Sequence, residues 1–294
     1  MTATIRYSTL PPLLLAVVLF NIPLAHAQNA ASLQARHAAL REALASNVFQ
    51  RPVTLESSEQ SSTLKGDVYA RIAQPFTVVG PALQGVAHWC ELLILHQNVK
   101  YCRPEVPRTA DILSVNVGRK FDQPLGDTQL FKFHYQTVAS KQDYLQVVLK
   151  ADVGPLGTSN YRIMLEVVAI DAQRSFLHMS YSYSYGMAAR IAMQGYLTTA
   201  GRDKVGFSTV GGKTKGKPHY IGGTRGVVER NTMRYYLAIE AYLAALSVAE
   251  PLRFEKRLSD WYDAVERYPR QLHELERGEY LDMKRREIKR QNAP

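Results

Sequence analysis

The chain has 294 residues, of which 46% are hydrophobic, and it carries a formal net charge of +10 at pH 7 and only two cysteines. A chain of this length forms a sizeable core in one large domain without metals or many disulfides, and no stretch beyond the N-terminal region is long and apolar enough to cross a bilayer. The positive charge favours anionic partners such as phosphate groups and membrane surfaces. No zinc-finger, RRM-like or helix-turn-helix signature is present, so we expect no nucleic-acid partner.

The N-terminal sequence MTATIRYSTLPPLLLAVVLFNIPLAHAQ has the layout of a secretory signal peptide. One cation, Arg6, precedes an apolar run over residues 13–20, and the stretch closes with Ala25-His26-Ala27. The apolar run is shorter than the roughly 20 residues that a membrane anchor needs. We therefore expect cleavage after Ala27, export, and a periplasmic location for the mature protein.

The region after this leader predicts short helices and an extended segment. Residues 30–46 are rich in helix formers and predict a short N-terminal helix, and residues 52–72 have an extended pattern. In residues 75–89 apolar side chains recur at helical spacing, with Gly80-Pro81 in the middle. Because proline and glycine interrupt helices, this stretch predicts two short helices.

Both cysteines lie in HWCELLILHQNVKYC, residues 88–102. Eleven residues separate Cys90 from Cys102, and two lone cysteines at such spacing most often pair in an oxidising compartment. Closing such a loop contributes about 3 kcal/mol in the chain-entropy model. The alternatives are free buried thiols, or a zinc site that adds His88 and His96 but lacks the tight ligand pairs of known sites. We expect a structural disulfide between a helix end and the next strand, with no metal and no cofactor.

After Cys102 the periodicity of the sequence becomes two, which predicts strands. The alternation is plain in QLFKFHYQTV (129–138) and DYLQVVLKADV (143–153). The segments ILSVNVGRKF, YRIMLEVVAI and SFLHMSYSYSYG have the same texture and follow at short intervals. Short loops between successive strands favour an antiparallel meander.

The C-terminal part of the chain returns to helical patterns. Residues 187–201 predict a helix, residues 205–212 a last strand, and residues 213–226 a basic, glycine-rich loop. The longest helical run, 226–247, is apolar nearly all round in its second half, so protein must cover it. Residues 249–294 predict a charged amphipathic helix with a basic end.

This order of elements resembles the START-like, or helix-grip (SRPBCC-type), family. GDVYARIAQPFTVVGPALQGVAHWC is similar to the family's opening strand, helix pair and tryptophan-bearing turn, and GGTRGVVERNTMRYYLAIEAYLAAL occupies the place of its closing helix. The resemblance covers residues 52–248 and implies an α+β fold in which a curved antiparallel sheet wraps a long C-terminal helix. The signal peptide 1–27, the N-terminal helical segment 28–51 and the C-terminal helix 249–294 lie outside this domain.

Proteins of this family mostly hold apolar or amphiphilic ligands in a cavity between sheet and helix, and some are cyclases or hydroxylase components. The alternating tyrosines of SYSYSYG suit the wall of such a cavity, because each ring has an apolar body and a polar tip. The alternative is that they only pack against neighbouring strands. Glu240 stands alone in an apolar stretch, so it must be protonated or paired, and an arginine partner is the alternative to ligand contact. The cavity candidates are Phe131, Phe133, Tyr135, Tyr181, Tyr183, Tyr185, Arg230, Met233, Arg234, Leu237, Glu240 and Ala241.

The basic loop is a second candidate site. Its glycines allow close backbone approach, and it leads into a helix N-terminus, where anions are favoured. The P-loop spacing is absent, and a solvated flexible loop is the alternative. The anion-binding candidates are Lys213, Lys215, Lys217, His219 and Arg225.

No nucleophile elbow, zinc-protease pair or kinase motif is present, so we assign no catalytic residue. We expect an exported protein that binds a lipid or other amphiphilic small molecule. Its basic loop and basic tail are expected to recruit it to anionic membranes. One alternative is a START-like enzyme of the cyclase or hydrolase type that uses Glu240, or one of the strand residues His134 and His178, as acid or base. The other is an envelope scaffold without ligand, which docks a partner through Trp261 and Tyr268 of its C-terminal helix.

Overall fold

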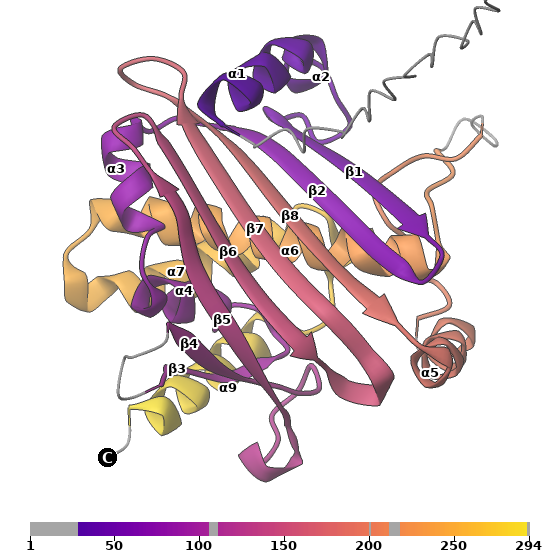
Figure 1. The fold of residues 1–294 in the computed structure, drawn as a ribbon. Helices are drawn as coiled ribbons and strands as arrows, with labels where there is room; N and C mark the ends of the chain where they lie inside the picture. The colour runs from indigo at the N-terminus through magenta and orange to yellow at the C-terminus, as the bar shows by residue number, and fades with distance from the viewer. Residues whose placement is uncertain (1–28, 106–110, 200, 212–217, 293–294) are drawn as a thin grey trace, which may run out of the picture.

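A computed structural model describes residues 29–105, 111–199, 201–211 and 218–292 of the chain (Figure 1). Short 3₁₀ turns, η1 (Leu125–Asp127), η2 (Pro155–Gly157) and η3 (Ala245–Ser247), accompany the longer elements. The helices are α1 (Ala30–Ala39), α2 (Arg41–Ala45), α3 (Phe76–Ala82), α4 (Val86–Leu93), α5 (Met187–Thr198), α6 (Gly223–Ala244), α7 (Glu250–Glu266), α8 (Pro269–Leu272) and α9 (Arg277–Gln291).

Eight strands form one antiparallel sheet in the order β1-β2-β8-β7-β6-β5-β4-β3. The run from β4 to β8 is the predicted meander, and β3 extends it at one edge. The last strand of the run lies beside β2, which precedes the helix pair α3–α4. The strands are β1 (Val53–Gln60), β2 (Thr63–Ile72), β3 (Val99–Pro104), β4 (Ile112–Val117), β5 (Gln129–Ser140), β6 (Tyr144–Val153), β7 (Thr158–Ala169) and β8 (Ser175–Tyr185).

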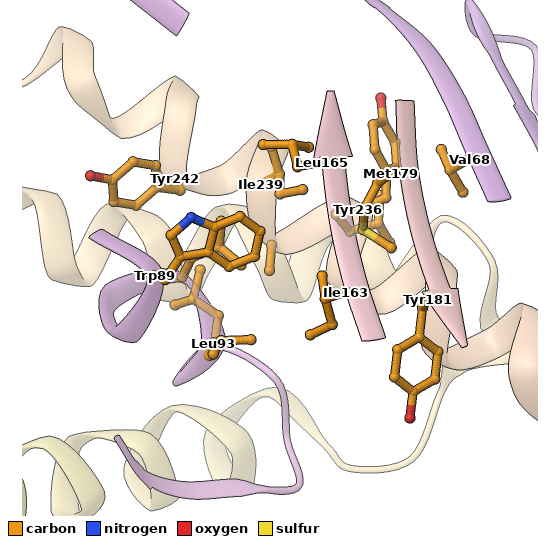
Figure 2. Packing of buried hydrophobic residues seen from close by; sticks show 14 of the residues in the cluster. Val68, Trp89, Leu93, Ile163, Leu165, Met179, Tyr181, Tyr236, Ile239 and Tyr242 are labelled. Carbon is orange, nitrogen blue, oxygen red and sulfur yellow. The ribbon is translucent and has the colours of Figure 1, made fainter. Parts of the chain in front are cut away.

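The long helix α6 lies across one face of this sheet, here called the inner face (Figure 1). This arrangement confirms the helix-grip fold expected from the sequence. Side chains alternate between the faces of a strand, so Met179 and Tyr181 of β8 share the inner face with Ile163 and Leu165 of β7. Figure 2 shows these side chains gathered with those of α4 and α6 in the main core.

The helix α6 lies close to the sheet at Gly66 of β2. A Cβ atom at this position would lie 2.2 Å from Oγ1 of Thr232 on α6. Glycine is therefore required here because any larger residue would push the helix away from the strand.

The outer face of the sheet is covered in part by the N-terminal helices. Leu33, Leu40 and Leu44 of α1 and α2 pack on residues of β6, β7 and β8, among them Tyr144 and Phe176. These strand residues alternate with the inner-face residues, so the predicted N-terminal helix caps the opposite side of the sheet from α6.

The C-terminal segment contains two long helices, α7 and α9, with the short α8 between them, instead of the single helix expected over 249–294. Pro269 follows the end of α7, and a capping box between Glu276 and Glu279 starts α9. Trp261 of α7 is buried and stacks on Tyr280 of α9 with ring centroids 4.8 Å apart. The two helices thus belong to the main core.

Two further expectations differ from the structure. The strand expected over 205–212 is reduced, among its described residues, to an isolated bridge between Thr209 and Tyr220. The break between α3 and α4 falls at Leu83–Gly85 instead of Gly80-Pro81, because Pro81 is accommodated in the last turn of α3 and Gly85 adopts a φ of 101°. No helix in the described part of the chain meets the length and hydropathy that a membrane span requires.

Candidate functional site

A cavity of about 290 Å³ lies between the inner face of the sheet, α6 and the turn that follows α4. Its walls come from elements far apart in the sequence, which the sheet order brings together. It is lined by Leu93, His96, Asn98, Val99, Val115, Val117, Phe131, Phe133, Pro155, Thr158, Tyr161, Ile163, Tyr181, Tyr183, Met193, Asn231 and Tyr235.

Aromatic rings form much of this wall. Tyr161 stacks on Tyr183 with ring centroids 5.2 Å apart and meets Phe131 edge-on at 5.0 Å. The ring of Tyr235 on α6 lies 5.3 Å from that of Tyr181 on β8. Such contacts hold the rings in fixed orientations, which gives the cavity a stable shape.

Three tyrosine hydroxyls in the wall have no hydrogen-bond partner among the described residues. The hydroxyls of Tyr181, Tyr183 and Tyr235 make no hydrogen bond to any described residue, whereas that of Tyr161 donates to Oγ1 of Thr158 at 2.9 Å. Burial raises the pKa of each of these three tyrosines, so the phenols stay protonated and neutral. The wall therefore combines apolar surface with a few polar groups, which is the make-up of small-molecule sites.

His96 is the one histidine that borders the cavity among the described residues. Its side chain is 4% exposed, and its ring lies 4.8 Å from that of Tyr235. The backbone N–H of Asn98 donates to its Nδ1 at 3.2 Å, while its buried Nε2 has no partner. Burial, with help from the positive charges of Arg234, Lys284 and Lys100, holds the pKa of His96 well below its usual range.

The turn that carries His96 is fastened from both sides. A disulfide joins Cys90 in α4 to Cys102 in β3, as the sequence predicted. On the other side, Tyr280 of α9 donates a hydrogen bond of 2.8 Å to the carbonyl oxygen of Leu95. The segment between the two cysteines therefore has little freedom to move.

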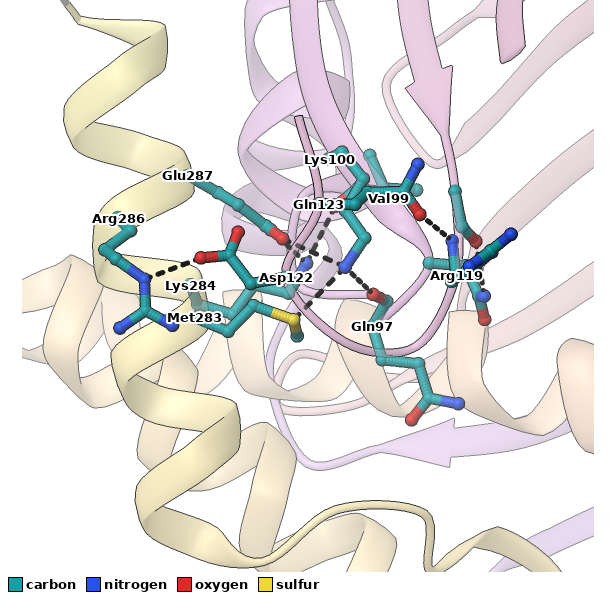
Figure 3. A network of polar contacts seen from close by, with 12 residues as sticks. Gln97, Val99, Lys100, Arg119, Asp122, Gln123, Met283, Lys284, Arg286 and Glu287 are labelled. Carbon is teal, nitrogen blue, oxygen red and sulfur yellow. Dashed lines mark hydrogen bonds and ion pairs between the residues drawn. The ribbon is translucent and has the colours of Figure 1, made fainter. Parts of the chain in front are cut away.

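A fully buried cluster of Lys100, Lys284 and Glu287 adds to this fastening (Figure 3). Glu287 accepts from Nζ of Lys100 at 3.0 Å and from Nζ of Lys284 at 2.8 Å. Lys284 also donates to the carbonyl oxygens of His96 and Val99, at 2.9 and 2.7 Å. Burial lowers the pKa of Lys284 to about 8.

The strand candidates divide between this cavity and its surroundings. Phe131, Phe133, Tyr181 and Tyr183 line the cavity. Tyr135 and Tyr185 do not, because their hydroxyls engage other elements. That of Tyr135 accepts from the backbone N–H of Gly85 at 2.7 Å, and that of Tyr185 donates to Glu59 at 2.5 Å.

The helix candidates lie on other faces of α6. Asn231 and Tyr235 border the cavity, whereas Arg230, Met233, Arg234, Leu237, Glu240 and Ala241 do not. The second half of α6 is apolar nearly all round, so the sequence pattern did not reveal which face meets the cavity. Met233 and Leu237 are packed in the core instead.

The charged members of this group are paired with other elements. Glu240 is bound to Arg51 and accepts a hydrogen bond of 2.6 Å from Tyr236, which is the arginine pairing given as the alternative. Arg234 pairs with Glu274 at 3.0 Å, and burial lowers its pKa to about 10. Arg230 lies 3.4 Å from the carbonyl oxygen of Val205, to which it donates.

The anion-binding candidates are only partly described. Lys213, Lys215 and Lys217 lie outside the described residues, and His219 is exposed. Arg225 donates to the backbone carbonyl oxygen of Ser57 on β1 at 3.0 Å. The described part of this loop therefore uses its arginine to hold α6 against the edge strand.

The strand histidines of the enzyme hypothesis are far from the cavity. His134 is exposed on the outer face of β5. His178, on the outer face of β8, lies between Asp67 at 2.8 Å and Glu166 at 2.9 Å. No described carboxylate borders the cavity, so the described walls contain no carboxylate–histidine pair.

Two larger hollows of about 640 and 550 Å³ open on the surface around Arg51 and Arg267. The second is bordered by Glu240 and Ala241. In the second hollow, Arg51 and Glu240 already pair with each other. The cavity beside α6, whose wall combines stacked aromatic rings with a few polar groups, is the better candidate for a ligand site.

No family model matches the sequence, and no curated protein matches it. Several solved structures are similar to the chain at low identity. A START superfamily protein from Mycobacterium smegmatis is 12% identical with a TM-score of 0.30, covering 48% of this chain and 93% of its own. The Zhui aromatase/cyclase from Streptomyces sp. R1128 is 11% identical with a TM-score of 0.34, and the match covers 72% of this chain and 99% of the cyclase. Norcoclaurine synthase from Thalictrum flavum is 16% identical with a TM-score of 0.31, covering 49% and 90%.

Proposed function

We propose that this protein, which has the START-like helix-grip fold, binds a small amphiphilic molecule in the cavity beside α6. The observation that carries the proposal is the wall itself. Stacked aromatic rings supply apolar contact, and the hydroxyls of Tyr181, Tyr183 and Tyr235 have no hydrogen-bond partner among the described residues. A ligand with a ring body and a polar group satisfies both kinds of surface.

The volume of the cavity restricts the size of the ligand. A volume of about 290 Å³ lies at the small end of the range of ligand pockets, which is about 300–1,000 Å³, and this favours a small ligand. We therefore propose a compact ring compound as the ligand, at the small end of the amphiphiles that the sequence led us to expect.

Binding is favoured over catalysis by the chemistry of the wall. An acid–base mechanism uses groups that gain and lose protons near pH 7. The neutral phenols of the cavity and a histidine with a strongly lowered pKa are poor proton carriers at that pH. Of the two docking residues in the scaffold alternative, Trp261 is buried and Tyr268 is half-buried.

We further propose export and contact with anionic membranes, in keeping with the leader sequence and the net charge of +10. An exposed apolar patch of Leu156 in η2 and Met187 and Ile191 in α5 supports this. The same two elements border the cavity through Pro155 and Met193. A ligand that leaves a membrane at this patch enters the cavity without crossing the body of the protein.

A variant that fills the cavity tests the proposal. Native mass spectrometry and organic extraction of protein purified from a periplasm detect a molecule that co-purifies with it. If no ligand co-purifies, the protein is incubated with a panel of ring compounds and binding is measured. Asn231→Trp places a large side chain in the cavity, whereas Leu252→Trp adds the same side chain at an exposed position. We expect binding to wild type and to Leu252→Trp but not to Asn231→Trp. Equal binding by all three, or none by wild type, contradicts the proposal.

A further inference from the structure

We infer that the open hollow of about 640 Å³ beside Arg267 is a second binding site, which takes an aromatic carboxylate with one negative charge. This hollow and the cavity beside α6 have no lining residue in common. The second site is therefore independent of the proposed function. Three features of the hollow support it: the aromatic rings of its lining, the charge of its walls, and a buried amide that faces it.

Three segments that are far apart in the sequence supply the aromatic lining. Phe49 precedes β1, Phe207 lies in the segment before α6, and Tyr268 lies between α7 and α8. The three rings contact one another, with centroids 5.5, 5.9 and 5.4 Å apart. The ring of Tyr220 also lines the hollow. Rings gathered in this way offer both faces and edges to another ring, so we expect the apolar part of the ligand to be aromatic.

The charge of the walls is positive and only partly balanced. Arg51 and Arg267 line the hollow, whereas no described carboxylate does. Arg51 is already bound to Glu240, which lies outside this hollow. Arg267 is exposed, and its guanidinium has no hydrogen-bond or ion-pair partner among the described residues. One positive charge is therefore left without a counter-charge, and this matches a ligand with a single negative charge.

A buried amide provides a further group for the ligand. Gln271 lines the hollow and is only 7% exposed, yet its side chain makes no hydrogen bond to a described residue. Neither atom of this amide is sealed from solvent, so a ligand in the hollow can reach it. Buried polar groups are rarely left unpaired in folded proteins. A ligand oxygen that accepts from the amide N–H is therefore a natural partner.

The donor groups favour a carboxylate over other anions. A guanidinium presents its N–H groups in a planar fork that fits the two oxygens of a carboxylate. A phosphate monoester carries close to two negative charges near pH 7, and the described walls have no free cation for the second. A ring ammonium ion is repelled by Arg267, and a neutral ring leaves its charge without a partner. We therefore expect a flat ring packed on the aromatic lining, with its carboxylate at Arg267 and Gln271.

The test compares 2-naphthoate with 2-naphthalenemethanol, which has the same two rings and no charge. The methyl resonances of Val48, which lines the hollow, report binding in an NMR titration of the protein. We expect wild type to bind 2-naphthoate roughly 10-fold more tightly than the alcohol, and the difference to shrink at high salt. Arg267→Gln removes the charge, so the preference should disappear. Arg103→Gln is the matched control, because Arg103 is an exposed arginine of β3 that does not line the hollow.

The outcomes separate this site from the cavity beside α6. Asn231→Trp fills that cavity, so binding of 2-naphthoate that persists in this variant supports the second site. Equal affinity of wild type for the acid and the alcohol overturns the inference, as do equal losses in Arg267→Gln and Arg103→Gln. A Val48 resonance that does not move with 2-naphthoate also overturns it and leaves the proposed function standing, even if Ile163 in the cavity responds. Tighter binding of 2-naphthyl phosphate than of 2-naphthoate overturns the assignment of a carboxylate.

Discussion

Nζ of Lys284 lies 2.9 Å from the carbonyl oxygen of His96, so the last helix of the chain holds the wall of the cavity. The contact joins residues 188 positions apart. It depends on Glu287, which binds both Lys284 and Lys100 in a cluster with no exposed surface. The C-terminal helix therefore supports the wall of the candidate site.

Removing the carboxylate of this cluster is expected to destabilise the protein strongly. Glu287→Gln leaves two buried lysines without a counter-charge, and breaking a buried ion pair in this way costs about 3–5 kcal/mol. Urea unfolding measures the loss. Glu255→Gln is the matched control, because Glu255 of α7 pairs with Arg285 of α9 at the surface, and an exposed pair contributes less than about 1 kcal/mol. Similar losses in the two variants would show that the cluster does not hold α9.

Much of the fold was predictable, because its signals are local. Strand alternation, as in Tyr181 and Tyr183, and the position of Cys90 and Cys102 can be read from adjacent residues. The face of α6 was not predictable, since residues on all sides of its second half are apolar. The place of His96 beside the cavity was not predictable either, because the fold brings Lys284 against the turn that carries it. The one signal in the sequence was a polar residue directly after the apolar run LLIL.

The buried group of Asp67, His178 and Glu166 predicts a pH dependence of stability. Burial lowers the pKa of His178, but hydrogen bonds to the two carboxylates outweigh it and raise the pKa above 6.5. Because protonated His178 binds the two carboxylates, it stabilises the fold fully below about pH 6.5. This stabilisation is lost as the pH rises through the pKa of His178 in the folded protein. The pKa of Asp67 is lowered despite burial, so its contribution is present above about pH 4 and lost in stronger acid.

Asp67→Asn tests this prediction. We expect the difference in unfolding free energy from wild type to be largest near pH 5–6 and to narrow toward pH 9. Denaturant titrations at several pH values measure it, and NMR titration of His178 shows a lower pKa in the variant. A difference that stays constant between pH 5 and pH 9 would mean that the charge on His178 contributes nothing to the pairing.

The close approach of α6 to β2 predicts a coupled pair of substitutions. Gly66→Ala places a Cβ atom against Thr232, and overpacking of this kind costs about 1–3 kcal/mol. Adding Thr232→Ala removes the atom that clashes, so the double variant should recover most of the loss. The unfolding free energies of the four proteins form a double-mutant cycle. Additive losses would contradict the contact between helix and sheet.

The apolar patch on α5 predicts a defect in membrane binding. Met187→Ser with Ile191→Ser removes exposed apolar surface beside the cavity, so co-sedimentation with anionic vesicles should fall several-fold. Val48→Ser with Leu252→Ser removes exposed apolar residues elsewhere and serves as the control. Equal binding by the two double variants would exclude the α5 patch as the membrane contact.

A methyl NMR titration with 1-tetralone, a compact ketone with two fused rings, tests the location of the ligand site most directly. The account predicts that the methyl resonances of Val115, Ile163 and Met193, which line the cavity, shift with the ligand. Those of Leu64 and Val68, which are buried on β2 and do not line the cavity, should stay unchanged. Shifts confined to Ala241 and Leu243, beside the open hollow near Glu240, would contradict the account and place the ligand outside the cavity.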